Sequence, residues 1–324
     1  RKLRYVREDD KCQPADAIGA VKKLIHEHKV FMIHGGGCSN ASLAAKPEIE
    51  QAKVPWVITA STADTLTDPR NPYIFTTMLA AWMEAVGQVE HAFQLNAKRI
   101  AIVSQRDAWG RARYQPLLDA LTKGRKTQPV ADEELPVDPS DATAVALRVQ
   151  AAKPDVVLLV LFPKAAAIYM RDAFKVGFTP ITLGGSTIGD VDKFEKDVGI
   201  PGSVNKLRSI TAAGYTPDEP KLAEWKKAVE AMYPGEVFSI WHMFGISSGQ
   251  FVVEALKRTG RDLTREKLIQ VMSNLTVPVD TYGGPISCTP TDSQCHRTPA
   301  WFGLESGKVK LMGYTTVTPI HKQP

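Results

Sequence analysis

Short apolar runs alternate with amphipathic segments along most of the chain. Unbroken apolar runs are typical of buried strands, and apolar residues spaced three or four apart are typical of helices. The predicted strands span residues 3–7, 30–33, 56–59, 73–75, 99–104, 156–161, 301–304 and 308–316, with shorter ones near Val130 and Thr182. The predicted helices span residues 14–28, 40–51, 80–95, 112–121, 141–152, 164–176, 190–198, 221–233, 239–259 and 265–275. This alternation predicts an α/β fold built on parallel sheets.

Local signals place two boundaries. Thr264 precedes the last predicted helix and is a residue type that caps helix N-termini, so we expect it to be the N-cap. The sequence ESG at 305–307 separates the last two predicted strands and indicates a hairpin.

The length of the chain predicts two lobes, because 324 residues are about twice the ~150 of an average domain. Glycine and proline are spread evenly and no low-complexity linker is present, so we expect several close crossings between the lobes. The chain opens directly on a strand-like segment. We therefore expect leader residues and a βα unit of the first lobe to be missing from the sequence.

Composition narrows the function classes. Hydrophobic residues make up 44% and charged residues 23%, which is typical of a soluble globular protein. The net charge of +5 is spread over residues that mostly neighbour Asp and Glu. Because no basic stripe is interleaved with aromatic residues, nucleic-acid binding is not expected. No apolar run approaches the roughly 18 residues of a membrane span.

Four cysteines fall into two candidate pairs, with Cys12 and Cys38 each after a predicted strand and Cys288 and Cys295 in one polar loop. The even number favours disulfides and hence an oxidising compartment. Buried free thiols are the alternative. A zinc site is not expected, because no C-x-x-C pair is present and the histidines are scattered.

The glycine-rich segment at 34–40, HGGGCSN, lies between a predicted strand and a predicted helix. Backbone N–H groups at such a turn, with the side chains of Ser39 and Asn40, favour an anion at the helix N-terminus. The segment matches neither a phosphate-binding P-loop nor the dinucleotide-binding fingerprint. The alternative is a tight turn with a capping serine.

A second polar loop, TAST at 59–62, follows the next predicted strand. Ser61 and Thr62 supply hydroxyl groups, and the loop offers free backbone amides. A cluster that caps the following helix is the alternative. Together with Ser39, however, the loop places polar donors at the carboxyl ends of two consecutive strands, where open α/β sheets bind ligands.

Two aromatic residues follow strands of the predicted second lobe. Trp109 comes after the strand ending at Ser104, and Phe162 comes after the strand 156–161. Each could simply cover the core. As a pair they suit the apolar wall of a pocket.

A hydrolase is the competing hypothesis from another class. HGGG at 34–37 resembles the oxyanion loop of some lipases, and GISSG at 245–249 fits G-x-S-x-G around Ser247. A nucleophile elbow needs a strand, a sharp turn and a helix, whereas the apolar residues around 245–249 follow helical spacing. Catalysis by Ser247 is therefore not expected.

The order and spacing of several motifs resemble the type I periplasmic binding proteins of ABC transporters, from Lys2 to about Ile286. The similarity is to the leucine/isoleucine/valine-binding branch. The motifs are DDKC at 9–12, CS at 38–39, VPWVITAST at 54–62, RIAIV at 99–103, WG at 109–110 and KPDVV at 153–157.

The resemblance implies two doubly wound Rossmann-like lobes joined by a three-strand hinge near Leu79, Thr211 and Gly284. The first lobe would comprise residues 1–78 and 212–283, and the second residues 79–211 and 284–324. It also implies a disulfide between Cys12 and Cys38, location in the periplasm, and a monomer that binds a small carboxylated ligand. The lobes would close on the ligand, and a membrane permease would recognise the closed form. Neither a cofactor nor a metal is implied, and no residue is expected to be catalytic.

By the same resemblance, Ser39, Ala60 and Thr62 would hold the ligand carboxylate, with Trp109 and Phe162 around the ligand. Ser186 stands where amino-acid-binding members carry an acidic residue that pairs with the ligand ammonium. An unpaired buried ammonium would cost ~2–5 kcal/mol, so we expect an aromatic or arylaliphatic acid without an amine. A branched-chain amino acid is the alternative. Further polar contacts are expected from Ser239 and His242.

Overall fold

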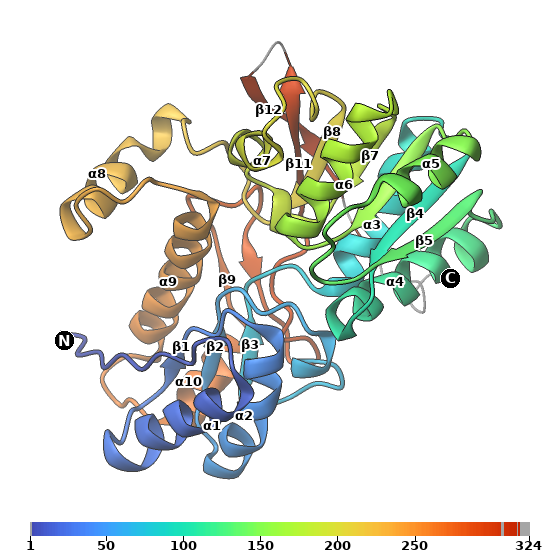
Figure 1. Cartoon of the computed structure of the whole chain (residues 1–324). Helices are drawn as coiled ribbons and strands as arrows, with labels where there is room; N and C mark the ends of the chain where they lie inside the picture. The colour runs from blue at the N-terminus through green and yellow to red at the C-terminus, as the bar shows by residue number, and fades with distance from the viewer. Residues whose placement is uncertain (1, 306–307, 316, 318–324) are drawn as a thin grey trace. The chain divides into compact units, whose positions relative to one another are not determined.

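The computed structural model describes residues 2–305, 308–315 and 317. The chain forms two compact units (Figure 1). Unit 1 comprises Arg1–Ala80 and Trp241–Arg297, and unit 2 comprises Ala81–Ile240 and Thr298–Pro324. Three segments group differently from the expected lobes, because residues 79–80 and 284–297 belong to unit 1 and residues 212–240 belong to unit 2.

Unit 2 contains one seven-stranded sheet in the order β12-β11-β8-β7-β6-β4-β5. The strands are β4 (Ile100–Gln105), β5 (Ala131–Leu135), β6 (Val156–Val160), β7 (Ile181–Gly184), β8 (Leu207–Thr211), β11 (Ala300–Glu305) and β12 (Lys308–Tyr314). Strands β4 to β8 pair in parallel, whereas β11 pairs antiparallel with β8 and with β12. The predicted hairpin is therefore confirmed, although Ser306, Gly307 and Thr316 lie outside the described residues.

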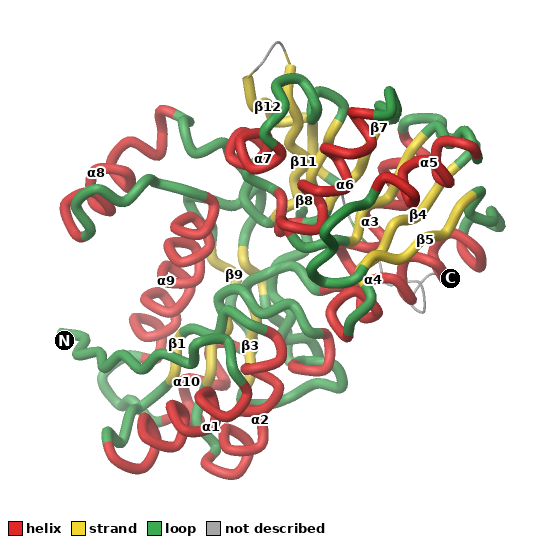
Figure 2. The backbone as a smooth tube through the Cα atoms, viewed as in Figure 1, coloured by secondary structure: helices red, strands yellow, loops and turns green. Residues whose placement is uncertain are grey.

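Helices cover both faces of this sheet (Figure 2). They are α3 (Ala81–Gln94), α4 (Ala108–Asp119), α5 (Thr143–Ala151), α6 (Pro163–Lys175) and α7 (Val191–Val198). Helix α8 (Ala223–Met232) also belongs to unit 2, but none of its residues, all of them described, is buried, so it does not cover the sheet. Helix α3 packs against α4, whereas α6 packs against α5 and α7 on the other face. Every residue of β6 is buried, as an apolar strand between two helical layers requires. The expected α/β fold with parallel strands is confirmed.

The strand order fixes where this sheet can bind a ligand. From β5 through β4, β6 and β7 to β8 it follows the doubly wound order 2-1-3-4-5. The connections from β4 and from β6 leave in opposite directions along the sheet. The two strands thus flank the topological switch point, and open α/β sheets bind ligands beyond the carboxyl ends of such a pair.

At the opposite edge of the sheet, a hydrogen-bond network joins the amino ends of β4 and β6. It involves the motifs RIAIV at 99–103 and KPDVV at 153–157. The Asp155 carboxylate accepts hydrogen bonds from the backbone N–H groups of Lys98 and Arg99, both at 2.9 Å. In return, the Arg99 guanidinium donates to the carbonyls of Lys153 and Ala152, at 3.0 and 2.6 Å. These two N–H bonds lower the pKa of Asp155.

We predict that Asp155→Ala lowers the free energy of unfolding by about 1 kcal/mol at pH 7, a modest effect because Asp155 is exposed. A lowered folded-state pKa stabilises the protein above the ordinary carboxyl pKa of about 3.9, and this contribution is lost as pH falls through the folded value. Urea unfolding at pH 7 and at low pH measures the change. Asp138→Ala, which breaks one exposed ion pair with Lys164, is the control and should change stability by less than about 0.5 kcal/mol. Equal losses in both variants would contradict this role of Asp155.

Unit 1 contains a parallel sheet in the order β1-β2-β3 and a separate antiparallel pair, β9 and β10. Its elements are α1 (Pro14–Lys22), β1 (Ile33–His34), α2 (Ser39–Ala52), β2 (Trp56–Ile58), β3 (Ile74–Thr76), α9 (Ile240–Thr259), α10 (Arg265–Met272), β9 (Thr276–Val277) and β10 (Ile286–Ser287). A buried apolar cluster from α1, α2 and the three parallel strands forms the core. The expected cap of α10 is confirmed, because the Thr264 side chain accepts a hydrogen bond from Lys267 N–H.

Two predictions in the first 30 residues need correction. The strand predicted over residues 3–7 is wrong, because this segment has no regular secondary structure and its Leu3 and Tyr5 side chains are 67% and 70% exposed. A stable strand needs paired backbone groups and an apolar face to bury. The helix predicted over residues 14–28 ends at Lys22 and continues as a π-type turn over Lys23–Glu27.

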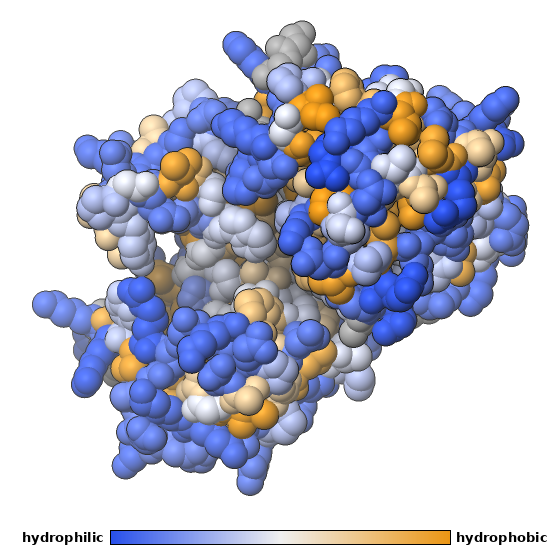
Figure 3. All heavy atoms as spheres, viewed as in Figure 1, coloured by the Kyte–Doolittle hydropathy of each residue, from blue (hydrophilic) through white to orange (hydrophobic). Residues whose placement is uncertain are grey.

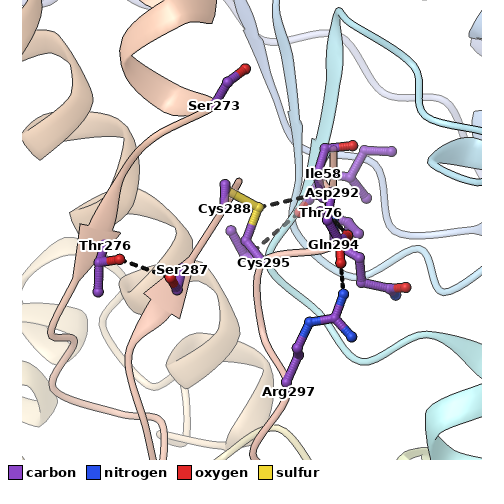
Figure 4. Close-up of a disulfide and its surroundings, with 12 residues drawn as sticks. Ile58, Thr76, Ser273, Thr276, Ser287, Cys288, Asp292, Gln294, Cys295 and Arg297 are labelled. Carbon is purple, nitrogen blue, oxygen red and sulfur yellow. Dashed lines mark hydrogen bonds and ion pairs between the residues drawn. A yellow bond between two sulfur atoms is a disulfide. The ribbon is translucent and has the colours of Figure 1, made fainter. Parts of the chain in front are cut away.

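The segment that precedes Thr298 is bound to the edge of β3, which explains its place in unit 1 (Figure 4). Thr76 donates its N–H to the Ser293 carbonyl and accepts from the N–H of Cys295, both at 2.9 Å. A disulfide between Cys288 and Cys295 closes this loop, and Arg297 pairs with Asp292. The segment 212–240 groups with unit 2, where the Tyr314 hydroxyl donates to the Gly214 carbonyl at 3.0 Å.

The second disulfide joins Cys12, just before α1, to Cys38, just before α2. Both cysteine pairs expected from the sequence are thus present. Because α1 and α2 also pack against each other, this bond fixes two neighbouring helices at their N-terminal ends.

Polar residues cover most of the drawn surface of each unit, and apolar residues gather in small clusters between them (Figure 3). Among the described residues, no helix is long and apolar enough to cross a membrane.

Candidate ligand-binding site

In unit 1, the loop after β1 is fastened to the loop after β2. The Gly36 carbonyl accepts hydrogen bonds from the N–H groups of Ala60 and Ser61, at 3.1 and 3.0 Å. Gly36 has a φ of +99°, and a Cβ there would lie 3.0 Å from the Trp56 ring. The expectation that loop 59–62 offers free amides is therefore corrected, because the amides of Ala60, Ser61 and Thr62 are all used inside the protein.

The hydroxyl groups of the two loops meet at the start of α2. Ser39 is the first residue of this helix, and its Oγ accepts a hydrogen bond from Thr62 N–H at 3.3 Å. Beside it, the buried hydroxyls of Ser42 and Ser61 lie 2.6 Å apart. The N-terminus of a 14-residue helix carries a partial positive charge, so an anion is favoured here. Ser39 and Thr62 are thus brought together, as the sequence predicts.

His34 at the end of β1 adds a polar group to the same end of the sheet. Its Nε2 lies 2.9 Å from Ser248 Oγ and 3.5 Å from Thr59 Oγ1. Desolvation by the surrounding protein lowers the pKa of His34 below its ordinary value. The sequence reasoning used this residue only in a lipase-like motif, and its contact with α9 could not be read from spacing.

In unit 2, two aromatic rings stack beyond the switch point. Trp109 follows β4 and Phe162 follows β6, with ring centroids 4.3 Å apart and planes inclined by 21°. Both side chains are partly exposed. The structure thus brings the predicted pair together as one aromatic wall, at the edge of the sheet where ligands bind.

Gln105, the last residue of β4, holds the two loops that carry these rings. Its side chain accepts from Phe162 N–H at 3.0 Å and donates to the Asp107 carboxylate at 3.0 Å. Asp107 in turn caps α4 by accepting from Gly110 N–H at 2.7 Å. A Cβ on Gly110 would lie 1.9 Å from the Gln105 carbonyl, so the Trp-Gly motif needs glycine to bring α4 this close to β4.

A buried ion pair lies behind the aromatic wall. Arg113 Nε lies 3.1 Å from Glu84 Oε2, with side-chain exposures of 5% and 1%. The Arg113 guanidinium carbon also lies 4.1 Å from the Trp109 ring centroid. Ser186 donates its hydroxyl hydrogen to the other Glu84 oxygen.

This network determines what Ser186 and Glu84 can offer a ligand. Both carboxylate oxygens of Glu84 already accept hydrogen bonds, one from Arg113 and one from Ser186. An ammonium group would have to compete with a buried guanidinium for this acid. The wall therefore combines aromatic surface with an already neutralised carboxylate.

Sequence reasoning missed Glu84, Arg113 and Gln105. The predicted helix began at residue 112 and left Trp109 outside it; because α4 in fact begins at Ala108, Trp109 and Arg113 are four residues apart on one helix and share a face. Glu84, by contrast, reaches Ser186 across 102 positions of the chain, and no local pattern predicts that contact.

Three further predicted site residues are placed separately. Asn40 is exposed on α2, whereas Ser239 and His242 are both partly buried. Ser239 belongs to unit 2 and His242 to unit 1. Their ligand contacts stay predictions.

The hydrolase hypothesis is excluded by the environment of Ser247. This serine lies inside α9, is fully buried, and its Oγ is 2.5 Å from Thr281 Oγ1. A nucleophile elbow would expose it on a sharp turn between a strand and a helix. Within the described part of the chain, no group of His, Cys, Asp and Glu side chains is arranged to hold a metal ion.

Known proteins supply the decisive comparison. The family model for periplasmic binding proteins matches residues 1–307. The chain belongs to this family. It is therefore an extracytoplasmic solute-binding protein of the ABC-transporter type and not an enzyme.

Several solved structures share the fold of this periplasmic binding protein. The leucine-binding protein LivK of Thermotoga maritima matches with a TM-score of 0.79 and 20% identity, over 97% of this chain and 88% of that one. A solute-binding protein of Rhodopseudomonas palustris, solved with 3,4-dihydroxybenzoic acid, matches with a TM-score of 0.78 and 22% identity, over 100% and 89%. LivJ of Streptococcus pneumoniae, solved with isoleucine, matches with a TM-score of 0.80 and 19% identity, over 98% and 88%.

A curated relative, the amino acid binding protein of Pseudomonas aeruginosa, is 22% identical over 157 residues. The match covers 48% of this chain and 42% of the relative's own length.

We predict that Arg113→Met destabilises the binding protein by about 3–5 kcal/mol, because it leaves the Glu84 carboxylate buried without its cation. Replacing both Glu84 and Arg113 by Met should restore part of this loss, since an apolar pair needs no charge compensation. Urea unfolding of the two variants measures both effects. A double variant that is less stable than Arg113→Met would show that the pair is not coupled as described.

Proposed function

We propose that this binding protein carries an aromatic or arylaliphatic carboxylate without an amino group, and delivers it to the membrane permease of an ABC importer. The observation that carries the proposal is the hydrogen bonding of the Glu84 carboxylate. Its two oxygens are engaged by Arg113 and Ser186, so unit 2 offers a stacked aromatic wall and no unpaired acid among the side chains of this network.

The polar loops of unit 1 support the carboxylate part of the proposal. Ser39 and Thr62 lie at the N-terminus of α2, where a carboxylate is stabilised by hydroxyl groups and by the helix dipole. The stacked rings of Trp109 and Phe162 support the aromatic part, because both side chains stay partly exposed and offer aromatic surface to a ligand ring.

Relatives are compatible with this ligand class and with its alternative. Solute-binding proteins of Rhodopseudomonas palustris have been solved with 3,4-dihydroxybenzoic acid, 4-hydroxybenzoate and benzoate. LivJ has been solved with isoleucine. A branched-chain amino acid is therefore the second candidate, and it is disfavoured here because its ammonium group would have to compete with Arg113 and Ser186 for the buried Glu84 carboxylate.

Closure of the lobes on the ligand, recognition of the closed form by the permease, location in the periplasm and function as a monomer stay predictions of the family resemblance. In this mechanism, binding energy shifts a conformational equilibrium and no covalent bond changes.

A thermal-shift screen with benzoate, 4-hydroxybenzoate, leucine and isoleucine tests the proposal. A ligand at 100 times its Kd stabilises the folded protein by about 2.7 kcal/mol, so we expect the benzoates to raise the melting temperature and the amino acids to leave it unchanged. A shift with leucine or isoleucine alone would contradict the proposed ligand and support the second candidate.

Calorimetric titration of variants tests whether the aromatic wall contacts the ligand. Trp109→Ala should weaken benzoate binding at least about tenfold, which corresponds to roughly 1.4 kcal/mol. Tyr233→Ala removes an aromatic ring that is 44% exposed and lies outside the wall, so benzoate affinity should be unchanged. Equal affinity in the Trp109→Ala variant and the wild type would remove the aromatic wall from the site.

A further inference from the structure

The two disulfides of unit 1 differ in how far solvent reaches them. Cys288 and Cys295 are only 3% and 1% exposed. Cys12, in contrast, is exposed, and its partner Cys38 is partly buried. In thiol–disulfide exchange a thiolate must approach one of the two sulfurs, so access limits the rate. A thiol reagent therefore reaches the Cys12–Cys38 bond much more easily than the Cys288–Cys295 bond.

The helices that follow Cys12 and Cys38 make these two cysteines unequal. Cys38 is the N-cap of α2, a helix of 14 residues, and it packs against the apolar core of unit 1. Cys12 lies one residue before the N-cap of α1, a helix of 9 residues. The partial positive charge at a helix N-terminus stabilises a thiolate, and the more stable thiolate is the better leaving group. Attack on the exposed Cys12 with release of Cys38 is therefore the favoured direction.

The same disulfide holds one end of the candidate ligand-binding loop. Cys38 directly precedes Ser39, whose Oγ accepts a hydrogen bond from Thr62 N–H. Three glycines come just before Cys38, and a Cβ added at Gly35 or Gly37 would meet no atom of the described residues within 4 Å. Such a loop gains conformational freedom when a covalent anchor is cut. Opening the bond thus loosens the position of Ser39.

We propose that the Cys12–Cys38 disulfide is a redox switch of this site: a dithiol reductant opens it, and its opening weakens binding of the ligand carboxylate. The effect on the ligand rests on the proposed function. The selective reduction of this bond does not.

The switch operates by two steps of thiol–disulfide exchange. One thiolate of the dithiol attacks Cys12 Sγ, which forms a mixed disulfide and breaks the bond to Cys38, so that Cys38 leaves as a thiolate. The second thiolate of the reductant then attacks its own sulfur in the mixed disulfide and releases Cys12. The protein gains two electrons, the dithiol is oxidised to a disulfide, and the two protons that the dithiol loses neutralise the two cysteines.

Differential alkylation of the full oxidised chain tests the selective reduction. The native protein is treated with dithiothreitol, alkylated with iodoacetamide and analysed by peptide mass spectrometry. We expect Cys12 and Cys38 to be alkylated at least about tenfold faster than Cys288 and Cys295, because access limits the exchange. The same treatment in urea should open both disulfides and is the control. Equal rates for the two pairs in the native protein would overturn the proposal.

A monothiol tests the direction of attack. Brief treatment with glutathione followed by alkylation should leave glutathione on Cys12 and the alkyl group on Cys38. Glutathione found mainly on Cys38 would contradict the role given to the N-terminus of α2.

Calorimetric titration with benzoate tests the effect on the site. The selectively reduced protein should bind benzoate about tenfold more weakly than the oxidised protein, because the loop must then be ordered on binding. The double variant Cys12→Ser/Cys38→Ser should match the reduced protein, and dithiothreitol should leave its affinity unchanged. Cooperative thermal unfolding shows that each form is folded.

Two results separate the switch from the proposed function. Equal benzoate affinity of the oxidised and the reduced protein would overturn the switch and leave the proposed function intact. An oxidised protein that binds no benzoate, although Cys12 and Cys38 are labelled selectively, would contradict the proposed function and confirm only the selective reduction.

Discussion

The carboxylate of Glu84 is buried in unit 2, and its neutralisation constrains everything around it. Removing a charge of this kind from water costs several kcal/mol unless ion pairing and hydrogen bonds replace the lost solvation. Arg113 supplies the opposite charge, and Ser186 supplies a second hydrogen bond. The same guanidinium lies over the Trp109 ring, so the electrostatic requirement of one acid helps to orient the aromatic wall that we assign to the ligand.

The wall stands where the topology of the sheet allows a site. Strands β4 and β6 flank the switch point of a doubly wound sheet, and their last residues lead directly into Trp109 and Phe162. Gln105 joins these two loops through a backbone amide and a capping carboxylate. The aromatic wall is therefore positioned by three features: the strand order, a loop-bridging amide and a buried ion pair.

Much of the fold could be predicted from the sequence, because periodicity reports on burial. The strand β6 and the cap at Thr264 follow directly from local pattern, and Ser39, Thr62, Trp109 and Phe162 were found by their position after strands. The prediction failed where local pattern and tertiary environment disagree. Residues 3–7 look like a strand but bury no apolar face. The short strand β8 was missed because polar residues interrupt it, and the Glu84–Ser186 contact was missed because it joins distant segments.

The central proposal is that the ligand is a carboxylate without an amino group. Its most direct test is a calorimetric comparison of two ligands with the same carbon skeleton, 3-phenylpropanoate and L-phenylalanine. They differ only in the α-ammonium group. If Glu84 is unavailable to that group, the acid should bind at least about 30-fold more tightly, which corresponds to the lower end of the ~2–5 kcal/mol cost of an unpaired buried charge. Equal or tighter binding of L-phenylalanine would contradict the account, because it would require an acceptor for the ammonium that this network does not supply.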